Sequence, residues 1–210
     1  MKQNLFLFFL LTTLVLNAEI PQFRGPNRDG IFPATGLLKQ WPEGGPALLK
    51  EITGIGNGWS SASISNGKIF ITGMIDSLDY LSCIDMNGNI LWKVPYGRSW
   101  NQSFPDTRST PTIVNGKIYV SSGMGVVACF DEATGKKIWS VDVFGQNEGV
   151  TGNWGVAESI LFVDGKAIFT TGGNKTTMVA IDAETGKEVW KTKSMNDNLA
   201  YVSPILIERN

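Results

Sequence analysis

Short runs of apolar residues alternate with turn residues along most of the chain. Within residues 110–121, two such runs flank Asn115 and Gly116, which tolerate the positive φ angles that a two-residue hairpin turn requires. Residues 126–130 and 137–143 form two further runs. β-Branched and aromatic side chains dominate all four runs, as a half-buried pleated surface favours. We therefore predict four antiparallel strands here, and no amphipathic helix is indicated after residue 18.

This pattern occurs three times, with a period near 49 residues. The hairpin turn recurs as Asn-Gly-Lys at residues 66–68 and 115–117 and as Asp-Gly-Lys at 164–166, so successive copies lie 49 residues apart. A second motif, in which Gly stands four residues before Trp, follows each turn. A four-stranded antiparallel unit repeated every ~40–50 residues is typical of a β-propeller blade. The repeated residues are Asp85, Asp131 and Asp182, then Gly88, Gly135 and Gly186, then Trp92, Trp139 and Trp190.

The second motif resembles the repeat of PQQ-binding-like (quinoprotein-type) β-propellers. Its third copy, residues 180–190, reads AIDAETGKEVW and matches the pattern Ala-x-Asp-x-x-Thr-Gly-Lys-x-x-Trp. Residues 21–30, PQFRGPNRDG, look like the opening of exported members of this superfamily. The resemblance covers essentially residues 20–210. It implies an all-β propeller of four-stranded antiparallel blades, in which the repeated Trp docks flat between neighbouring blades.

The chain supplies about three complete blades and two isolated strands, which predicts a partial propeller. One isolated strand is residues 45–54, where Leu49 takes the place of the repeated Trp, and the other begins an incomplete blade at residue 201. We interpret the chain as a fragment of a larger propeller; a four-bladed ring that joins the two isolated strands is the alternative. The predicted divisions are an N-terminal extension at 19–44, a partial propeller at 45–210, and blades at about 59–95, 108–143 and 157–193.

Residues 1–18 have the pattern of a secretory signal peptide. Lys2 precedes an apolar run at residues 5–16, and Ala18 ends a small-residue cleavage site. The run is too short to span a bilayer, although a buried strand or helix is the alternative interpretation. We therefore expect an exported protein, in the periplasm or outside the cell, without a membrane span. No Cys directly follows the run, so no lipid anchor is expected.

The amino-acid composition excludes several kinds of active site and binding site. The chain has 210 residues and no His, which excludes His-based zinc sites and Ser-His-Asp or Cys-His nucleophile systems. With 18 Lys and Arg against 19 Asp and Glu, it has no basic footprint for nucleic acid. Cys83 and Cys129 occupy the same position of two repeats, where Ala180 is the third equivalent, so we expect buried packing residues too far apart for a disulfide. Quinoprotein dehydrogenases of the resembled family use an adjacent Cys pair against the cofactor ring, and no such pair occurs here.

The repeated residues are predicted to be structural. Periodic Trp residues indicate packing between blades. The three aspartates stand at strand ends before turns, where a carboxylate accepts backbone N–H bonds more often than it serves in acid–base catalysis. Gly135 and Gly186 would supply the positive φ of those turns.

The residues that break the repeat are better candidates for function. The linkers at residues 96–109 and 144–157 would converge near the mouth of the central channel. Arg108 and Glu158 could pair across blades or bind a polar ligand. Aromatic rings there could stack on a ligand or pack between blades. The candidate channel-mouth residues are Trp59, Trp100, Arg108, Trp154 and Glu158.

The leading functional hypothesis is an exported, non-catalytic propeller that binds a protein partner or small polar ligand through its linker face and needs no cofactor. A protein of this kind would resemble the scaffold propellers of outer-membrane protein assembly. The alternative is a dehydrogenase that oxidises an alcohol or sugar with PQQ and calcium. Calcium needs several converging oxygen ligands, and Glu158 is the one candidate that the sequence offers. A carbohydrate-active propeller would need two facing carboxylates, and again Glu158 alone qualifies.

Overall fold

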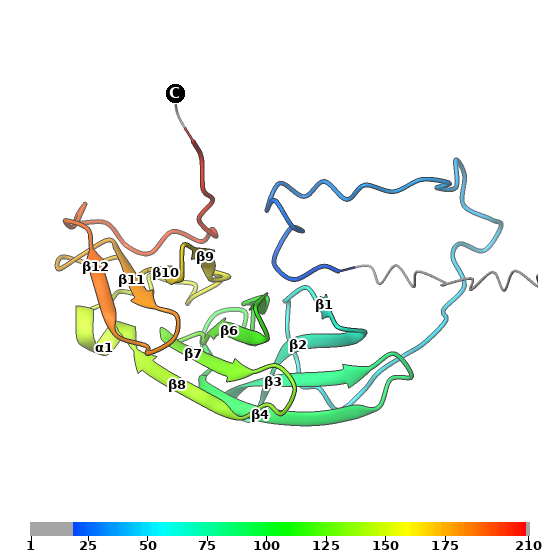
Figure 1. Ribbon diagram of the computed structural model, residues 1–210, viewed down its shortest axis with the longest axis horizontal. Helices are drawn as coiled ribbons and strands as arrows, with labels where there is room; N and C mark the ends of the chain where they lie inside the picture. The colour runs from blue at the N-terminus through cyan, green and yellow to red at the C-terminus, as the bar shows by residue number, and fades with distance from the viewer. Residues whose placement is uncertain (1–18, 209–210) are drawn as a thin grey trace, which may run out of the picture.

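The computed structural model describes residues 19–208, so the predicted signal peptide at residues 1–18 lies outside the described part. The described chain forms three four-stranded antiparallel sheets, each a meander of consecutive strands. Figure 1 shows the sheets arranged in an arc, with β1 and β9 on the inner side and β4, β8 and β12 on the outer side. The predicted all-β architecture of four-stranded blades is confirmed.

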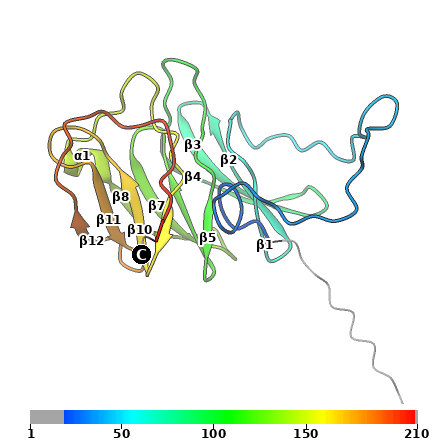
Figure 2. The ribbon, with the colours of Figure 1, turned by 90° about the horizontal axis from the view of Figure 1, so that it is seen from above.

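Each sheet is one blade. Blade 1 contains β1 (Ser63–Ser65), β2 (Lys68–Ile75), β3 (Leu78–Asp85) and β4 (Ile90–Arg98). Blade 2 contains β5 (Thr112–Val114), β6 (Lys117–Ser121), β7 (Val126–Asp131) and β8 (Lys137–Asp142). Blade 3 contains β9 (Leu161–Val163), β10 (Lys166–Thr170), β11 (Met178–Asp182) and β12 (Glu188–Lys191). Figure 2 shows the blades side by side from above.

The first hairpin of each blade turns at the Asn-Gly or Asp-Gly pair. In blade 2, Asn115 has φ 51° and Gly116 has φ 74°, and Val114 pairs directly with Lys117 across the turn. Two consecutive positive φ angles give the tight turn whose twist matches that of the flanking strands. This local requirement fixes the register of the first hairpin in each blade.

The hydrophobic core lies between blades. Alternation along β6 turns Ile118 and Val120 toward blade 1, where they pack in one cluster with Phe70 and Leu81. The intervening Tyr119 belongs to a second cluster that reaches blade 3. Blade 2 is therefore apolar on both faces and covered on both.

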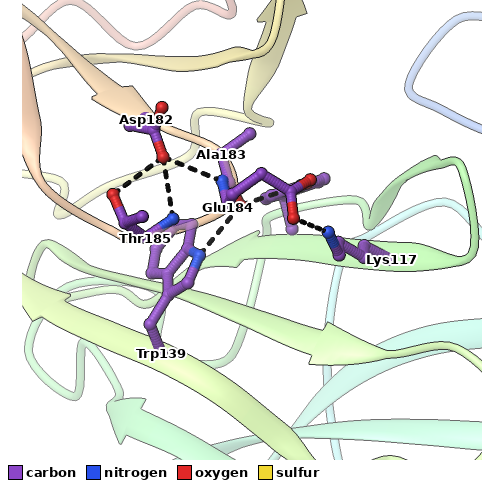
Figure 3. Close-up of polar contacts among 7 residues, drawn as sticks. Lys117, Trp139, Asp182, Ala183, Glu184 and Thr185 are labelled. Carbon is purple, nitrogen blue, oxygen red and sulfur yellow. Dashed lines mark hydrogen bonds and ion pairs between the residues drawn. The ribbon is translucent and has the colours of Figure 1, made fainter.

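An indole links each blade to the next. The Trp139 ring lies over Gly186 in the turn of blade 3, and its Nε1–H donates to the Ala183 carbonyl at 2.9 Å (Figure 3). The Trp92 ring likewise lies over Gly135 of blade 2, but its Nε1–H has no hydrogen-bond partner in the described chain. Trp190 has no following blade in the described chain and is 38% exposed, against 9% for Trp139. The tryptophans therefore differ in burial although their motifs are alike.

The turn that receives the indole is held by its own side chains. The Asp182 carboxylate accepts from the Thr185 hydroxyl at 2.7 Å and from the backbone N–H groups of Glu184 and Thr185, and Lys117 of blade 2 forms an ion pair with Glu184 (Figure 3). In the equivalent turn of blade 2, the Thr134 hydroxyl lowers the pKa of Asp131 by donating a hydrogen bond to its carboxylate. These contacts shape the turn and present the glycine to the ring.

Serine and threonine side chains join the inner ends of the blades. The Thr72 hydroxyl donates to the Ser109 carbonyl at 2.6 Å, and 49 residues later the Ser121 hydroxyl donates to the Glu158 carbonyl at 2.6 Å. The Thr110 hydroxyl accepts from the backbone N–H of Ser61. Polar cross-links thus repeat with the period of the sequence.

The two isolated strands do not form. Residues 45–54 and 201–206 have no strand structure, because a strand requires a neighbour to pair with and each segment lacks one in the described chain. Each of these two segments nevertheless contacts a blade, on the side where an adjacent blade would pack. Lys50 donates to the Asn87 carbonyl at 2.6 Å, and the Ser159 N–H donates to the Ser203 hydroxyl at 3.0 Å. Lys50 packs beside Gly88 of the blade 1 turn, whereas Leu49 is 92% exposed, so the predicted equivalence of Leu49 with the repeated Trp is wrong by one residue.

One short helix, α1 (Val143–Asn147), occurs at the start of the predicted linker, where no helix was expected. Asp142 caps it by accepting from the Gly145 N–H at 2.8 Å, and Phe144 is buried beside Gly125 and Gly149. A local cap and one buried ring are enough to form a single turn, and neither produces a periodic pattern in the sequence.

Cys83 and Cys129 are buried free thiols. Burial raises the pKa of Cys83 to about 11 and that of Cys129 to about 12, so both are protonated near neutral pH.

Within residues 19–208, no helix combines the length and the apolar character needed to cross a membrane.

The N-terminal segment at residues 19–30 runs along the inner strands. Ile20 pairs with Ile64 of blade 1, and the Pro21 carbonyl accepts from the Ile113 N–H of blade 2 at 2.7 Å. The Arg28 guanidinium donates to the carbonyls of Ser159 and Ile160, both at 2.9 Å, at the start of blade 3. A single short segment therefore contacts all three blades.

We predict that Trp139→Ala lowers the free energy of unfolding by about 3–5 kcal/mol, because it removes a buried ring and its bond to the next blade. Trp190→Ala should cost much less in this chain, because the ring has no blade to contact. Urea unfolding followed by circular dichroism measures both. Equal losses would contradict a packing role that depends on the following blade.

We also predict that Gly135→Ala destabilises the protein more than Gly116→Ala. The two glycines have φ of 69° and 74°, so the backbone cost of a Cβ is matched. A Cβ at Gly135 would lie 2.7 Å from Trp92, whereas a Cβ at Gly116 would meet nothing within 4 Å. The difference between the two variants in urea unfolding should be about 1–3 kcal/mol, the usual cost of overpacking. No difference would mean that the indole does not rest on this turn.

Candidate functional site

The linkers between blades meet on one face of the molecule. The Ser103 hydroxyl in the first linker donates to the Asn153 carbonyl in the second at 2.6 Å. The rings of Phe104 and Trp154, one from each linker, have centroids 5.8 Å apart. The predicted convergence of these segments is therefore present in the structure.

Trp59 is held by its backbone and leaves its ring open. Its N–H donates to the Thr107 carbonyl at 2.7 Å, and its indole Nε1–H donates to the Pro105 carbonyl at 3.1 Å. The side chain is nevertheless 69% exposed. A fixed, exposed ring presents apolar surface with little conformational entropy left to lose on binding.

Arg108 lies at the centre of this face. Its guanidinium donates to the carbonyls of Ser103 and Phe104 and lies over the Tyr201 ring, 5.8 Å from the centroid. Its Nη1 is buried and has no hydrogen-bond partner within residues 19–208. Arg108 is thus held by linker carbonyls and by a ring, and one of its buried donors is unsatisfied.

Two adjoining cavities open beside Arg108. The larger, of about 370 Å³, is lined by Phe23, Arg24, Arg28, Trp59, Arg108, Ala157, Tyr201, Val202, Ser203 and Ile205. The smaller, of about 280 Å³, is lined by Trp59, Phe104, Arg108 and Tyr201. We call Trp59, Phe104, Arg108, Trp154 and Tyr201 the aromatic–arginine face. Its four aromatic side chains are each at least half exposed.

Glu158 lies behind the larger cavity and does not line it. It is fully buried; Oε1 accepts from the Thr170 N–H at 3.0 Å, and Oε2 has no partner in the described chain. Burial raises its pKa to about 8, although the Thr170 hydrogen bond and the charge of Arg28 oppose the shift. Burial also lowers the pKa of Arg28, against the charge of Glu158.

The predicted pairing of Arg108 with Glu158 does not occur among the described ion pairs. Arg108 is held instead by linker carbonyls and by Tyr201. Arg28, which belongs to the N-terminal segment and was not among the candidates, is the cation that influences Glu158.

Trp100 is not available to a ligand. It is 4% exposed and donates from Nε1 to the Ser103 carbonyl at 2.9 Å, and a Cβ on Gly155 would lie 2.5 Å from its ring. Close packing on a glycine explains the burial. Of the five candidates, Trp59 and Arg108 line both cavities, Trp154 lies on the same face, Trp100 packs beneath the linker and Glu158 is buried.

Asp79 is a buried carboxylate that sequence reasoning missed. One oxygen accepts from the Thr107 hydroxyl and the other from the Gly123 N–H at 2.7 Å, so it fixes the linker just before Arg108. Burial raises its pKa, although these hydrogen bonds and the charge of Arg108 oppose the shift. The signal was present: Asp79 shares a strand face with Leu81 and Cys83, both fully buried, because residues two apart point the same way.

The calcium-dependent alternative can be tested against these donors. Calcium takes about six to eight oxygen ligands, usually several of them carboxylates. Within residues 19–208, no three Asp, Glu, His or Cys side chains gather into a metal-binding group. Glu158, the one candidate, has one oxygen on Thr170 and a raised pKa. The described residues therefore do not fit a calcium site by themselves.

The family model described as outer membrane protein assembly factor BamB matches residues 78–206. The chain belongs to this family of PQQ-like repeat propellers. The family resemblance expected from the Trp motif is therefore confirmed.

Relatives of two kinds are similar to this family member. The quinohemoprotein alcohol dehydrogenase of Comamonas testosteroni is 36% identical over 101 residues, which is 45% of this chain and 14% of that protein. The outer membrane protein assembly factor BamB of Kangiella koreensis is 25% identical over 141 residues, which is 65% of this chain and 32% of that protein. The chain thus spans less than a third of the length of either relative.

Solved structures agree on the fold. The crystal structure of the Comamonas testosteroni quinohemoprotein alcohol dehydrogenase matches 65% of this chain and 21% of its own, with a TM-score of 0.51 and 25% identity. The computationally designed Ika4 protein matches 78% of this chain and 88% of its own, with a TM-score of 0.51 and 11% identity, and shows the fold alone.

We predict that Glu158→Gln removes a loss of stability at high pH. The pKa of Glu158 is raised in the folded protein above its unfolded value, so its contribution is fully present below about pH 4.5 and is lost as pH rises through about 8. The free energy of unfolding should be measured with urea at acid, neutral and alkaline pH. The value for the variant should rise relative to that for wild type as pH rises, by a few kcal/mol in total. Glu51→Gln, at an exposed site, is the control. A pH-independent difference between Glu158→Gln and wild type would mean that Glu158 is ionised in the folded state.

Proposed function

We propose that this chain is part of an exported, non-catalytic β-propeller that binds a polypeptide partner through the aromatic–arginine face. The observation that carries the proposal is the exposure of Trp59, Phe104 and Tyr201 around the fixed guanidinium of Arg108. Contiguous exposed aromatic side chains are costly in water and mark interaction sites. Tryptophan, tyrosine and arginine are also the residues that most often dominate binding energy at protein interfaces.

The family supports this function at a general level. A relative named as an outer membrane protein assembly factor shares 25% identity over 65% of the chain. Export is supported by the apolar N-terminal run and the cleavage pattern that ends at Ala18.

A PQQ- and calcium-dependent alcohol or sugar dehydrogenase is the second candidate. It is favoured by the 36% identity to the Comamonas testosteroni quinohemoprotein alcohol dehydrogenase. It would require cofactor ligands from parts of a larger protein, since the described residues do not fit the calcium site.

We predict that a photo-crosslinking amino acid in place of Phe104 captures a specific protein in the cells that express this chain. The same amino acid in place of Lys187, on the turn of blade 3, should not. The captured protein, identified by mass spectrometry and purified, should bind wild type and should bind Trp59→Ala at least about tenfold more weakly, the loss expected of an interface hot spot. Trp41→Ala is the matched control, because Trp41 is 66% exposed but lies outside the aromatic–arginine face.

Two results would contradict the proposal. One is capture that is equal at both positions or absent at both. The other is retention of PQQ with calcium by the purified protein, together with dye reduction by alcohols or aldoses, which would establish the dehydrogenase function instead.

A further inference from the structure

Three arginines line the larger cavity beside the aromatic–arginine face. Arg24 and Arg28 come from the N-terminal segment and Arg108 from the linker before blade 2. None of them forms an ion pair with a carboxylate within residues 19–208. Their contacts go to uncharged oxygens: the backbone carbonyls of Asp29, Ser159, Ile160, Ser103 and Phe104, and the Gln22 side chain.

Two of these arginines, Arg28 and Arg108, have guanidinium nitrogens buried from solvent, whereas Arg24 is exposed. Arg28 is 5% exposed, and its Nε is buried without a partner, as is Nη1 of Arg108. Buried guanidinium donors without acceptors are costly, and a carboxylate can satisfy two of them at once. Glu158 behind the cavity offsets this positive charge little at neutral pH, because its pKa is raised to about 8.

We propose that this cavity recognises an acidic side chain, Asp or Glu, on a polypeptide segment that crosses the aromatic–arginine face. The inference rests on the proposed function and names the chemistry of the partner. The carboxylate would lie between Arg108 and Arg24, with Arg28 at the base of the cavity.

The surroundings favour a side chain within a segment over a chain end. The two cavities adjoin and share Trp59, Arg108 and Tyr201. Each cavity also has an apolar ring in its lining, Phe104 in the smaller and Phe23 in the larger, and Arg108 lines both. A segment that passes over the arginine can place apolar residues in both cavities, whereas a chain that ends at its carboxylate could fill only one.

The test uses three short acetylated peptides of one length. The first has a Glu between leucines and an amidated end, the second has Gln in place of Glu, and the third has Gln with a free C-terminal carboxylate. Binding to the full chain is followed by the NMR shift of the Trp59 indole N–H, assigned with Trp59→Phe. We expect the Glu peptide to bind at least about tenfold more tightly than the other two, as for a hydrogen bond to a charged group.

Substitution of individual arginines tests which of them recognise the carboxylate. Arg108→Gln should remove the preference for Glu over Gln, and Arg24→Gln should reduce it. Arg24 is exposed, and within the described residues its guanidinium donates only to the Asp29 carbonyl, so its variant remains informative if Arg108→Gln is unstable. Arg98→Gln, at the exposed end of β4, should leave the preference unchanged. Added salt should weaken the Glu peptide more than the Gln peptide.

The inference is overturned if Glu and Gln peptides bind equally, if the free C-terminus binds as tightly as Glu, or if no peptide shifts the indole. It is also overturned if both arginine variants keep the preference. Each of these results leaves the proposed function to be decided by crosslinking at position 104, so the two failures are distinguishable.

Discussion

The contact on which the arrangement of blades depends is an indole laid over a glycine in the next blade. Trp139 can approach Gly186 closely because that residue has no Cβ and adopts φ 72°. The carboxylate of Asp182 shapes the turn, and the ring then covers it. Each blade therefore needs its neighbour's turn as much as its own strands, as expected for repeat architectures in which units bury surface only by stacking.

Much of the fold could be predicted because the information is local and repeated. The Asn-Gly and Asp-Gly pairs specify the hairpins, and the 49-residue spacing gives the blade count. The isolated strands at 45–54 and 201–206 were mispredicted because a strand depends on a partner that pattern alone does not supply. The serine and threonine cross-links were missed, although Ser61, Thr110 and Ser159 are themselves 49 residues apart. A polar residue recurring at the repeat period was a readable signal.

The candidate site was predicted only in part, for a different reason. Trp59 and Arg108 could be found because they interrupt the repeat. Trp100 interrupts it too, yet Gly155 allows it to be buried, and no sequence rule distinguishes the two tryptophans. Arg24, Arg28 and Tyr201 reach the cavity from segments distant in sequence, so their contribution depends on tertiary contacts. Glu158 was expected near the mouth of the channel, but it is fully buried, under residues that pattern analysis did not bring together.

The contacts of the N-terminal segment affect how cooperatively the molecule unfolds. In a chain of stacked units with only nearest-neighbour contacts, an end unit can fray while the others stay folded. Here Ile20, Pro21 and Arg28 bond to blades 1, 2 and 3 in turn. Opening any one blade therefore disturbs a segment that the other two also hold. The N-terminal segment therefore couples the three blades into one cooperative unit. Its residues are synthesised before any of the blades that they join.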